Sequence, residues 1–400
     1  MDPVRNPFTP GAGTQPPELA GRENILNDAT IAIQRANLNK PNQSQMLLGL
    51  RGVGKTVLLN KIEEIALNNG HLTVFIEAPE QRPLAELITP KIAQILRKLS
   101  FNEDVKGKVH SALKAVKSFI GSVKLEYAGV AISVDPEPGV ADSGDFEADF
   151  SELMVIIGET AKAAGKPITI LIDEVQYLSE KDLAALIVAL HKINQKNLPV
   201  LFFGAGLPQV AALSGEAKSY SERLFHYPPV GPLGGDAAKL ALKHPIENEE
   251  ASIQEEALNY ILRKTQGYPY FLQEWGFQVW NICETGEITL SDAEEATEKA
   301  EQRLDDSFFN ARFSRLTPKE RQYVIAMANL GSGPLYKSSD VADMLSQPLN
   351  SLGPCRSKII HKGMIYSPSH GDIAFTVPLF NEYLNRCHPN IEEGYEDNEG

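Results

Sequence analysis

The sequence predicts an α/β protein with a parallel-sheet core, followed by a helical segment and then by helices with a hairpin. Two observations predict this class. Short apolar runs alternate with longer amphipathic segments up to about residue 230, as strands and helices do in parallel sheets. After the Pro- and Gly-rich stretch 231–235, the apolar positions follow helical spacing until a short hairpin pattern near the C-terminal end.

The composition limits the classes of protein to which the chain can belong. Its 400 residues suffice for two or three domains, and 42% apolar with 22% charged residues exclude overall disorder. No apolar run approaches the roughly 18 residues of a membrane span, and the first residues lack a secretion signal. The three widely spaced cysteines indicate neither a disulfide framework nor a metal site. We therefore expect a cytoplasmic protein, and its net charge of -14 argues against coating nucleic acid with its whole surface.

The stretch 45–67 predicts a phosphate-binding loop between a buried strand (45–50) and a helix (57–67). Residues 49–56 read GLRGVGKT and match G-x-x-x-x-G-K-[ST], whose glycines let the backbone N–H groups curl around an anion. Lys55 can reach the β- and γ-phosphates, and the hydroxyl of Thr56 can bind Mg²⁺. The alternative is a chance Gly-rich turn, which the flanking strand and helix disfavour. The predicted nucleotide-binding residues here are Gly49, Leu50, Arg51, Gly52, Val53, Gly54, Lys55, Thr56 and Val57.

The other elements of the core follow in order along the chain. Strands are expected at 71–77, 167–172 and 199–203, the last of them ending before Gly204. Helices are expected at 25–36, 83–99, 101–120, 146–164 and 182–194. The segments 123–127 and 130–134 alternate around Ala128-Gly129 and predict a β-hairpin, to which no function can be assigned.

Two carboxylates, Asp173 and Glu174, follow the apolar strand 167–172. Since parallel strands end at a common edge, they should lie beside the phosphate loop. Asp173 would then support Mg²⁺, directly or through a water, and Glu174 would polarise the attacking water. The alternative is a strand end capped by two solvated acids, which the position relative to Lys55 and Thr56 makes the weaker interpretation.

The part of the chain after residue 235 predicts helices with defined starts. Capping boxes are expected at Ser252–Glu255, Ser291–Glu294 and Thr317–Glu320. From residue 308 on, helices are expected at 319–328, 339–345 and 349–362, and residues 364–366 and 373–376 flank a turn. Three helices and a hairpin are the outline of a winged helix.

The third helix of this outline carries a possible DNA-contacting set. Residues 310–390 contain nine basic and five acidic side chains, although the whole chain is acidic. Arg356, Lys358 and Lys362 lie on the helix that a helix-turn-helix unit places in the major groove. The alternative is a winged helix that only packs against protein, with a solvated third helix.

Taken together, these residues resemble an AAA+-type ATPase. The branch is that of the origin-recognition/initiator ATPases, the archaeal-type AAA ATPase domain proteins and the STAND signalling NTPases. GLRGVGKT matches Walker A, and ILIDEVQ matches Walker B. The resemblance implies that Gly21 and Arg22 lie beside the adenine and that Pro269, in a lid G-x-P motif, lies near the base. It also implies that Arg223 is an arginine finger acting from a neighbouring subunit.

The resemblance implies a domain organisation. It consists of an extended N-terminal arm (1–17), a P-loop ATPase core (18–232) with a helix and hairpin insertion (101–144), a helical lid (233–306), a winged helix (307–388) and an acidic disordered tail (389–400).

Two departures from the family pattern bear on function. The strand before Gly204 lacks the polar sensor residue that many AAA+ proteins carry, since Asn197 is at its wrong end. Pro269 stands where a lid sensor Arg is expected. Both favour a slow ATPase or a nucleotide switch. We therefore expect a switch that binds Mg²⁺ and ATP, whose hydrolysis of ATP is coupled to movement of the lid and the winged helix. The expected partner is duplex DNA. The alternatives are a STAND-like signalling or defence NTPase whose winged helix binds protein, and a structural nucleotide binder without turnover. A homo-oligomer would supply Arg223 in trans.

Overall fold

The computed structural model describes residues 1–11, 13–80, 82–100, 103–123 and 134–390. It divides into two compact units. The sheet unit comprises Arg22–Gly49 and Gly54–Val230, and the lid unit comprises Met1–Gly21, Leu50–Val53 and Gly231–Gly400. The phosphate loop is thus shared between the units, so each part of it is described below within its own unit.

The sheet unit is built on five parallel strands in the order β2-β3-β4-β1-β5. The strands are β1 (Ser44–Leu48), β2 (Leu72–Glu77), β3 (Ile168–Asp173), β4 (Val200–Gly206) and β5 (Phe225–His226). Every residue of β3 and β4 is buried, as central strands covered on both faces require. β4 continues through Gly206, so the predicted end of the strand before Gly204 is wrong. The two-residue β5 was not predicted.

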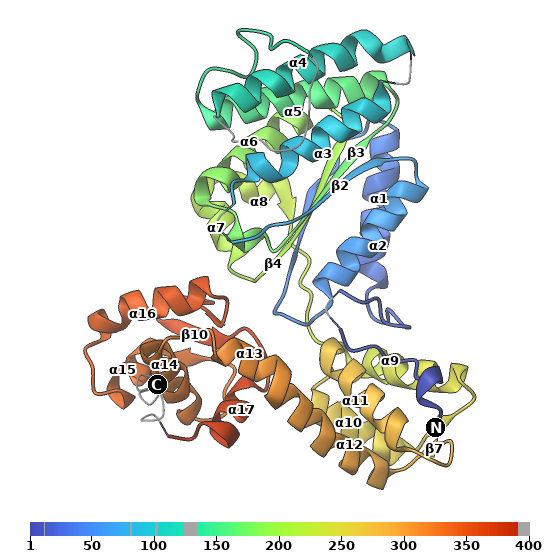
Figure 1. Cartoon of the computed structure of the whole chain (residues 1–400), viewed down its shortest axis with the longest axis vertical. Coiled ribbons are helices and arrows are strands. Elements are labelled where there is room, and N and C mark those ends of the chain that lie inside the picture. Colours follow the sequence, from blue (N-terminus) through green and yellow to red (C-terminus); the bar gives the residue numbers. More distant parts are fainter. Residues whose placement is uncertain (12, 81, 101–102, 124–133, 391–400) are drawn as a thin grey trace. The chain divides into compact units, whose positions relative to one another are not determined.

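Helices cover both faces of this sheet. α1 (Glu23–Asn37) and α2 (Lys55–Asn68) lie on one face, and α3 (Leu84–Leu99), α5 (Phe146–Ala163) and α6 (Glu180–Gln195) lie on the other (Figure 1). The remaining helices of the unit are α4 (Lys106–Ser122), α7 (Val210–Ala217) and α8 (Ser221–Leu224). The predicted hairpin at 123–134 falls on residues 124–133, which lie outside the described residues.

The lid unit begins with four helices: α9 (Gly235–Asn248), α10 (Glu255–Thr265), α11 (Pro269–Ile282) and α12 (Leu290–Arg303). Two short strands, β6 (Ser252–Ile253) and β7 (Glu287–Ile288), pair between them. Two predicted capping boxes are therefore wrong. Ser252 lies in β6, where pairing takes its backbone out of the cap position, and α12 is capped by Thr289 with Asp292 instead of Ser291 with Glu294.

The N-terminal arm packs on these helices. Residues 3–5 form a 3-10 helix, and the Asn6 amide donates to the carbonyl of Phe277 at 3.0 Å. Phe8 is fully buried against Gly276 of α11, where a Cβ would lie 2.6 Å from the Phe8 ring. The first residues of the predicted extended arm are thus seated by an aromatic side chain that fills the space left by a glycine.

The chain then forms a C-terminal module, which we define as α13 (Asn310–Phe313) to α17 (Phe380–Cys387). A π-helical stretch, Leu304–Phe309, joins it to α12. Its other elements are α14 (Pro318–Asn329), β8 (Tyr336–Lys337), α15 (Ser338–Met344), α16 (Leu349–His361), β9 (Ile365–Tyr366) and β10 (Asp372–Phe375). The strands form an antiparallel sheet in the order β8-β10-β9. Helix, strand, two helices and a hairpin are the element order of a winged helix, with β8 as an unpredicted strand. The predicted α/β class with a parallel-sheet P-loop core and a C-terminal helical domain is confirmed.

The predicted capping box of α14 is present. Glu320 accepts from the Thr317 N–H at 2.8 Å, and the Thr317 side chain caps the N–H of Glu320 in return. Among the described residues, no helix combines the length and the apolar character that crossing a bilayer demands. The predicted acidic tail falls on residues of which 391–400 lie outside the described part of the chain.

Candidate nucleotide site

The phosphate-loop residues of the sheet unit lie between β1 and α2. Gly54 adopts a left-handed conformation, with φ of 92°, and is the N-cap of α2. That conformation costs glycine little, and it leads directly into Lys55, the first residue of the helix. Lys55 is 6% exposed. The amino end of α2 therefore presents backbone N–H groups and a buried ammonium at the carboxyl edge of the sheet, as a site for a phosphate requires.

Asp173 joins this group from the end of β3. Its carboxylate accepts a hydrogen bond from the Thr56 hydroxyl at 2.5 Å and another from the Glu174 N–H at 2.8 Å. The carboxyl group is 2% exposed, and burial is the main reason that its pKa is raised; the nearby charge of Glu174 raises it further. The Thr56 hydrogen bond and the charge of Lys55 act in the opposite direction. The structure thus brings together the two predicted metal-binding residues, Thr56 and Asp173.

The chemistry of these two side chains fits Mg²⁺. A hydroxyl and a carboxylate are hard oxygen donors, and a cation beside Asp173 would offset the cost of burying its charge. The described residues hold no group of three or more His, Cys, Asp or Glu side chains that could form a metal cage of their own.

Glu174 lies next to Asp173 in an unusual backbone conformation. Its φ of 52° is left-handed, which costs a non-glycine residue about 1 kcal/mol or more. The 3-10 turn Val175–Tyr177 follows, and the Gln176 amide donates a hydrogen bond to the Glu174 carboxylate. The side-chain amide oxygen of Gln176 in turn accepts from the N–H of Leu207 at 3.1 Å. Sequence reasoning missed Gln176, although it stands within the ILIDEVQ motif.

The phosphate-loop residues of the lid unit are held by aromatic residues of the lid. The Tyr268 hydroxyl donates to the Arg51 carbonyl at 2.8 Å, and the Tyr270 N–H donates to the Gly52 carbonyl at 3.2 Å. A Cβ on Gly52 would approach the Tyr268 ring to 3.2 Å, and φ at Gly52 is 83°. The Arg51 N–H donates to the carbonyl of Thr376 in the C-terminal module at 3.2 Å. Within this unit, residues 50–53 are therefore held by Tyr268 and Tyr270 and by Thr376 of the C-terminal module.

Two other predicted residues, Gly21 and Pro269, belong to the lid unit. A Cβ on Gly21 would lie 2.8 Å from Ala237 and 3.7 Å from Leu233. Leu233 also pairs with the lid motif, because its N–H donates to the Gly267 carbonyl at 2.8 Å, two residues before Pro269. Pro269 is the first residue of α11. Gly21 and Gly267 of the G-x-P motif thus both contact the segment that contains Leu233, whereas Arg22 is the N-cap residue of α1 in the sheet unit.

The structure does not bring Arg223 to the other predicted catalytic residues of its unit. Arg223 lies in α8, just before β5, and its side chain is exposed. β5 runs parallel to β1 and pairs with Ser44 and Gln45, at the start of β1. Arg223 is therefore at the amino edge of the sheet, opposite the edge that carries Lys55 and Asp173.

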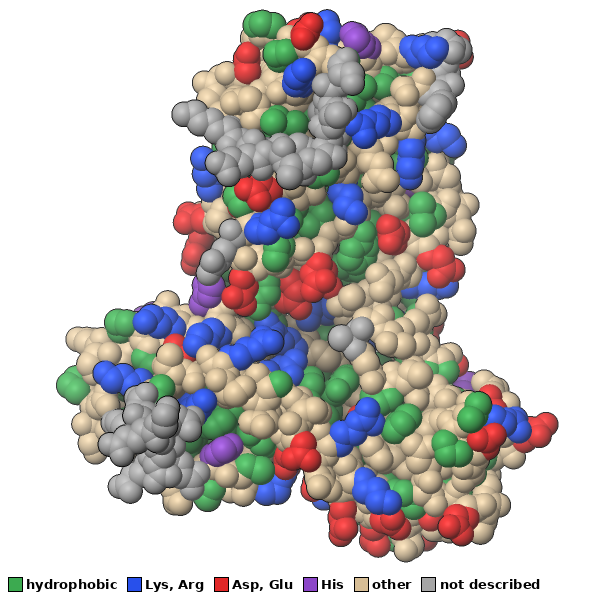
Figure 2. Space-filling model, viewed as in Figure 1, with side chains coloured by type: hydrophobic (Ala, Val, Ile, Leu, Met, Phe, Trp, Pro, Cys, Tyr) green, Lys and Arg blue, Asp and Glu red, His purple; other side chains and the backbone are tan. Residues whose placement is uncertain are grey.

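Two of the three cations predicted on the third helix of the winged helix are engaged within the C-terminal module. Lys362 donates to Glu320 at 2.6 Å and to the Arg315 carbonyl at 2.8 Å, and Glu320 is 2% exposed. Arg356 donates to the Ser338 hydroxyl at 2.9 Å. The side chain of Lys358 is exposed, and within the described part of the chain it makes no hydrogen bond or ion pair. Lys and Arg side chains gather over this module in the space-filling view (Figure 2).

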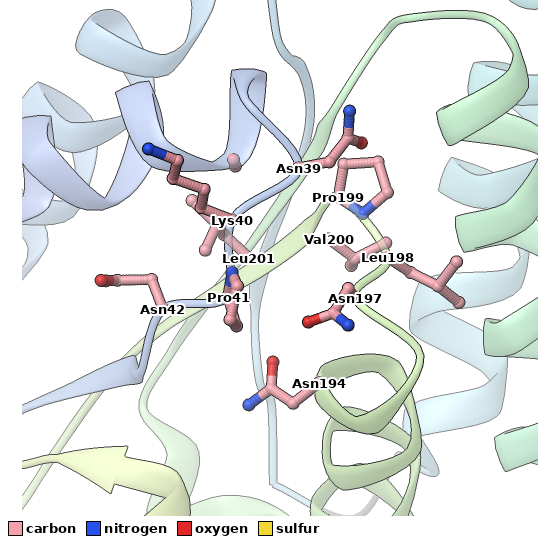
Figure 3. A pocket seen from close by; sticks show the side chains of 11 residues that line it. Asn39, Lys40, Pro41, Asn42, Asn194, Asn197, Leu198, Pro199, Val200 and Leu201 are labelled. Carbon is pink, nitrogen blue, oxygen red and sulfur yellow. The ribbon is translucent and has the colours of Figure 1, made fainter.

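A pocket lies in the sheet unit away from the predicted site. It is lined by parts of the segments 36–42 and 194–201, which precede or begin β1 and β4. Figure 3 shows the side chains of Asn42, Asn194 and Asn197 around it. The pocket is therefore at the amino edge of the parallel sheet, whereas the phosphate loop is at the carboxyl edge.

Comparisons with known proteins agree with this arrangement. Residues 18–203 match the family described as AAA ATPase domain, and residues 306–384 match one described as a domain of unknown function (DUF8462). The chain is 24% identical over 345 residues to the uncharacterized HTH-type transcriptional regulator MJ0774 of Methanocaldococcus jannaschii, covering 82% of this chain and 78% of the relative.

A solved structure shares the fold. The Walker-type ATPase PABY2304 of Pyrococcus abyssi has a TM-score of 0.58 at 15% identity, over 93% of this chain and 97% of that one. Cdc6p from Pyrobaculum aerophilum has a TM-score of 0.48 at 14% identity, over 98% of both chains. The family match covers both the phosphate loop and the acidic end of β3. Residues 18–203 therefore match an AAA ATPase domain, and the chain has the fold of a P-loop ATPase.

Proposed function

We propose that the protein is a slow, Mg²⁺-dependent ATPase that acts as a nucleotide switch. The observation that carries this proposal is the 2.5 Å hydrogen bond between Thr56 and Asp173 at the carboxyl edge of the sheet, beside the buried Lys55. The loop N–H groups and Lys55 bind the phosphates, and Thr56 and Asp173 hold the cation. Glu174 orients and polarises the attacking water. Bound Mg²⁺ supplies neutralisation of phosphate charge.

Phosphate release and the binding of a fluorescent ATP analogue test this proposal. Lys55→Ala should lose both binding and turnover, since its ammonium is the buried positive charge of the loop. Glu174→Gln should keep binding and lower kcat about 100-fold or more, as loss of a general base does. Lys61→Ala is a matched control, because Lys61 is on the same helix but pairs with Glu64 at the surface. Binding without turnover by the natural chain would favour the structural nucleotide binder instead.

The slow turnover that we propose follows from the end of β4. The residues there are Gly204, Ala205 and Gly206, which carry no polar side chain toward the site. Pro269 likewise offers no charge at the start of α11. A kcat well below the usual range of about 1–1000 s⁻¹ is expected. With such slow hydrolysis, the ATP-bound and ADP-bound states each last long. The lid and the C-terminal module can then take a different position in each state. An assembly that supplies Arg223 from a neighbouring copy would raise kcat with protein concentration.

A second proposal concerns duplex DNA. The element order of the C-terminal module and the name of the relative, an HTH-type transcriptional regulator, favour DNA association. The internal bonds of Arg356 and Lys362 leave Lys358 as the cation of α16 best placed for a phosphate. Lys358→Glu should therefore weaken salt-dependent binding to duplex DNA with little loss of stability. Lys299→Glu, on α12 of the lid, is the control for a change of net charge.

The outcome of this experiment separates the two classes of switch. Retention on DNA that weakens with salt and with Lys358→Glu supports a DNA-associated ATPase. Absence of retention, with ATPase activity intact, favours the STAND-like alternative in which the module contacts protein. Lys362→Glu is unsuited to the question, because it would leave the buried carboxylate of Glu320 facing a second acid and would unfold the module.

A further inference from the structure

We propose that Gln176 is a positioning residue that sets the orientation of the Glu174 carboxylate. It is anchored for this purpose to Leu207, the residue that follows β4. The inference rests on the proposed ATPase function. Gln176 occupies the 3-10 turn directly after Glu174, and its amide nitrogen donates to the Glu174 carboxylate. Its amide oxygen accepts from the Leu207 N–H at 3.1 Å. One side chain thereby connects the proposed water-polarising group to a neighbouring strand.

The second connection leads back to the phosphate loop. The peptide group between Gly206 and Leu207 is hydrogen-bonded on both sides. Its N–H binds Gln176, and its carbonyl accepts from the N–H of Gly49, the first loop residue, at 3.1 Å. A shift of Gly49 on occupation of the loop would therefore act on this peptide group and, through Gln176, on Glu174. All five residues belong to the sheet unit.

The glycine at the end of β4 is a condition for this arrangement. A Cβ on Gly206 would lie 2.9 Å from the Gln176 amide oxygen and 2.7 Å from Val210. Any larger side chain on Gly206 would push the amide away from the Leu207 N–H. Because Gly206 has no side chain, the Gln176 amide has room at the end of β4. The 3-10 turn thus supplies the polar group that β4 lacks at this point.

The left-handed backbone of Glu174 explains why its side chain needs an external partner. With φ of 52°, the residue turns the chain sharply between β3 and the 3-10 turn. The backbone N–H of Glu174 is used by Asp173, which fixes the main chain but leaves the carboxylate free to change rotamer. Within the described residues, the Gln176 amide donates a side-chain hydrogen bond to that carboxylate. Its removal should release the carboxylate from a single orientation.

The substitution Gln176→Glu separates the two hydrogen bonds. A glutamate keeps an oxygen that accepts from Leu207, but it has no donor for Glu174 and adds a like charge. We expect kcat for ATP to fall roughly 10- to 100-fold, as misplacement of a reacting group does. The affinity for the ATP analogue and the unfolding temperature should match those of the natural chain. Gln195→Glu is the control, since Gln195 is an exposed residue of α6 that is hydrogen-bonded to His191.

A double-mutant cycle tells positioning from a structural role. In a Glu174→Gln background, Gln176→Glu should lower kcat no further, because the group that it orients is already inactive. Full kcat in Gln176→Glu would overturn the inference, since the Leu207 bond alone would then suffice. Gly206→Ala should reproduce the loss of kcat by displacing the same amide.

A measurement without turnover keeps this inference separate from the proposed function. The side-chain amide signals of Gln176 in a nitrogen–proton correlation spectrum can be assigned by their absence in Gln176→Glu. They should shift in Glu174→Ala and not in Glu180→Ala, a nearby acid of α6. Unchanged signals in Glu174→Ala would show that the hydrogen bond is absent and would overturn the inference, whether or not ATP is hydrolysed.

Discussion

At the scale of single residues, burial of the Asp173 carboxyl group lowers the stability of the nucleotide-free protein at neutral pH. Its pKa is raised by burial, so the folded protein binds a proton more tightly there than the unfolded chain. The free energy of unfolding therefore falls as pH rises from about 4 through the raised pKa, and the full cost is present at neutral pH. Asp173→Asn should raise the unfolding temperature of the nucleotide-free protein at pH 7, and this gain should vanish near pH 4.

The same substitution should have the opposite effect on the loaded protein. An asparagine can still accept from the Glu174 N–H, but it brings no negative charge to the cation. We expect the apparent affinity for ATP in the presence of Mg²⁺, obtained from its stabilisation of the protein, to fall more than about tenfold. Thermal unfolding with and without Mg²⁺ and ATP measures both effects. A lower unfolding temperature of Asp173→Asn in the absence of nucleotide would contradict the argument.

His71 couples the fold of the sheet unit to pH. Its ring is buried, with Nδ1 2.8 Å from the Thr169 hydroxyl and Nε2 3.1 Å from the Ile33 carbonyl. Burial is the main reason that its pKa is lowered to about 4. The unfolded chain takes up a proton near pH 6.5 and the folded one does not, so stability is lost as pH falls from 6.5 toward 4.

We expect this loss to be on the order of 2 kcal/mol between pH 6.5 and 4. His71→Asn should unfold more easily at pH 7, because it breaks the link between α1, β2 and β3. Its stability should also depend less on pH in this range. Urea unfolding at a series of pH values measures the slope. An equal slope in the natural chain and in His71→Asn would show that other groups cause the pH dependence.

At the scale of elements, Phe8 and Gly276 test whether the N-terminal arm belongs to the lid. In the natural chain, Gly276→Ala places a methyl group 2.6 Å from the Phe8 ring and should lower the unfolding temperature. In a Phe8→Ala background the space is open, and the same change should stabilise α11 by up to about 1 kcal/mol through helix propensity. Phe8→Ala alone should cost about 3 kcal/mol or more. Equal effects of Gly276→Ala in both backgrounds would contradict the observed packing.

The elements also show which features of the sequence are predictive. Strands and helices of the sheet unit could be predicted because apolar periodicity extends over many residues. The two-residue strands β5 and β8 could not, since so few residues carry no period. The two capping predictions that failed have different causes. Ser252 lies in the short strand β6, and α12 is capped by Thr289, two residues before the predicted Ser291. The helix that begins at Pro318 had no such competitor, and its box at Thr317 is present.

The candidate site divides in the same way. The Walker residues Lys55, Thr56 and Asp173 could be predicted because their spacing and flanking elements fix them at one edge of a sheet. Contacts between distant segments could not be read from the sequence. The position of Arg223 at the amino edge depends on the pairing of β5 with β1. The amide bonds of Gln176 depend on the approach of β4, and the internal ion pair of Lys362 depends on how α16 packs on α14.

At the scale of the whole molecule, the phosphate loop has residues in both units. Residues 50–53 cluster with the lid unit, and Gly54 and Lys55 with the sheet unit. The proposed switch requires bound nucleotide to change the conformation of the molecule. We expect the radius of gyration, measured by small-angle X-ray scattering, to differ between the protein with Mg²⁺ and a non-hydrolysable ATP analogue and the protein without them. Lys55→Ala should show no change, whereas the control Lys61→Ala should respond as the natural chain does. An unchanged radius in the natural chain would contradict the proposed movement.

The chain passes between its two units four times, at 21–22, 49–50, 53–54 and 230–231, and each passage includes a glycine. A domain-swapped dimer forms when one hinge opens and a continuous piece of chain is exchanged. Here no single hinge releases the lid unit, because residues 1–21 and 50–53 are threaded into it from elsewhere in the sequence. The same threading forbids its transfer by recombination at one junction. Neither unit is therefore encoded by one continuous stretch of sequence, and two of the four passages between the units lie in the Gly-rich loop.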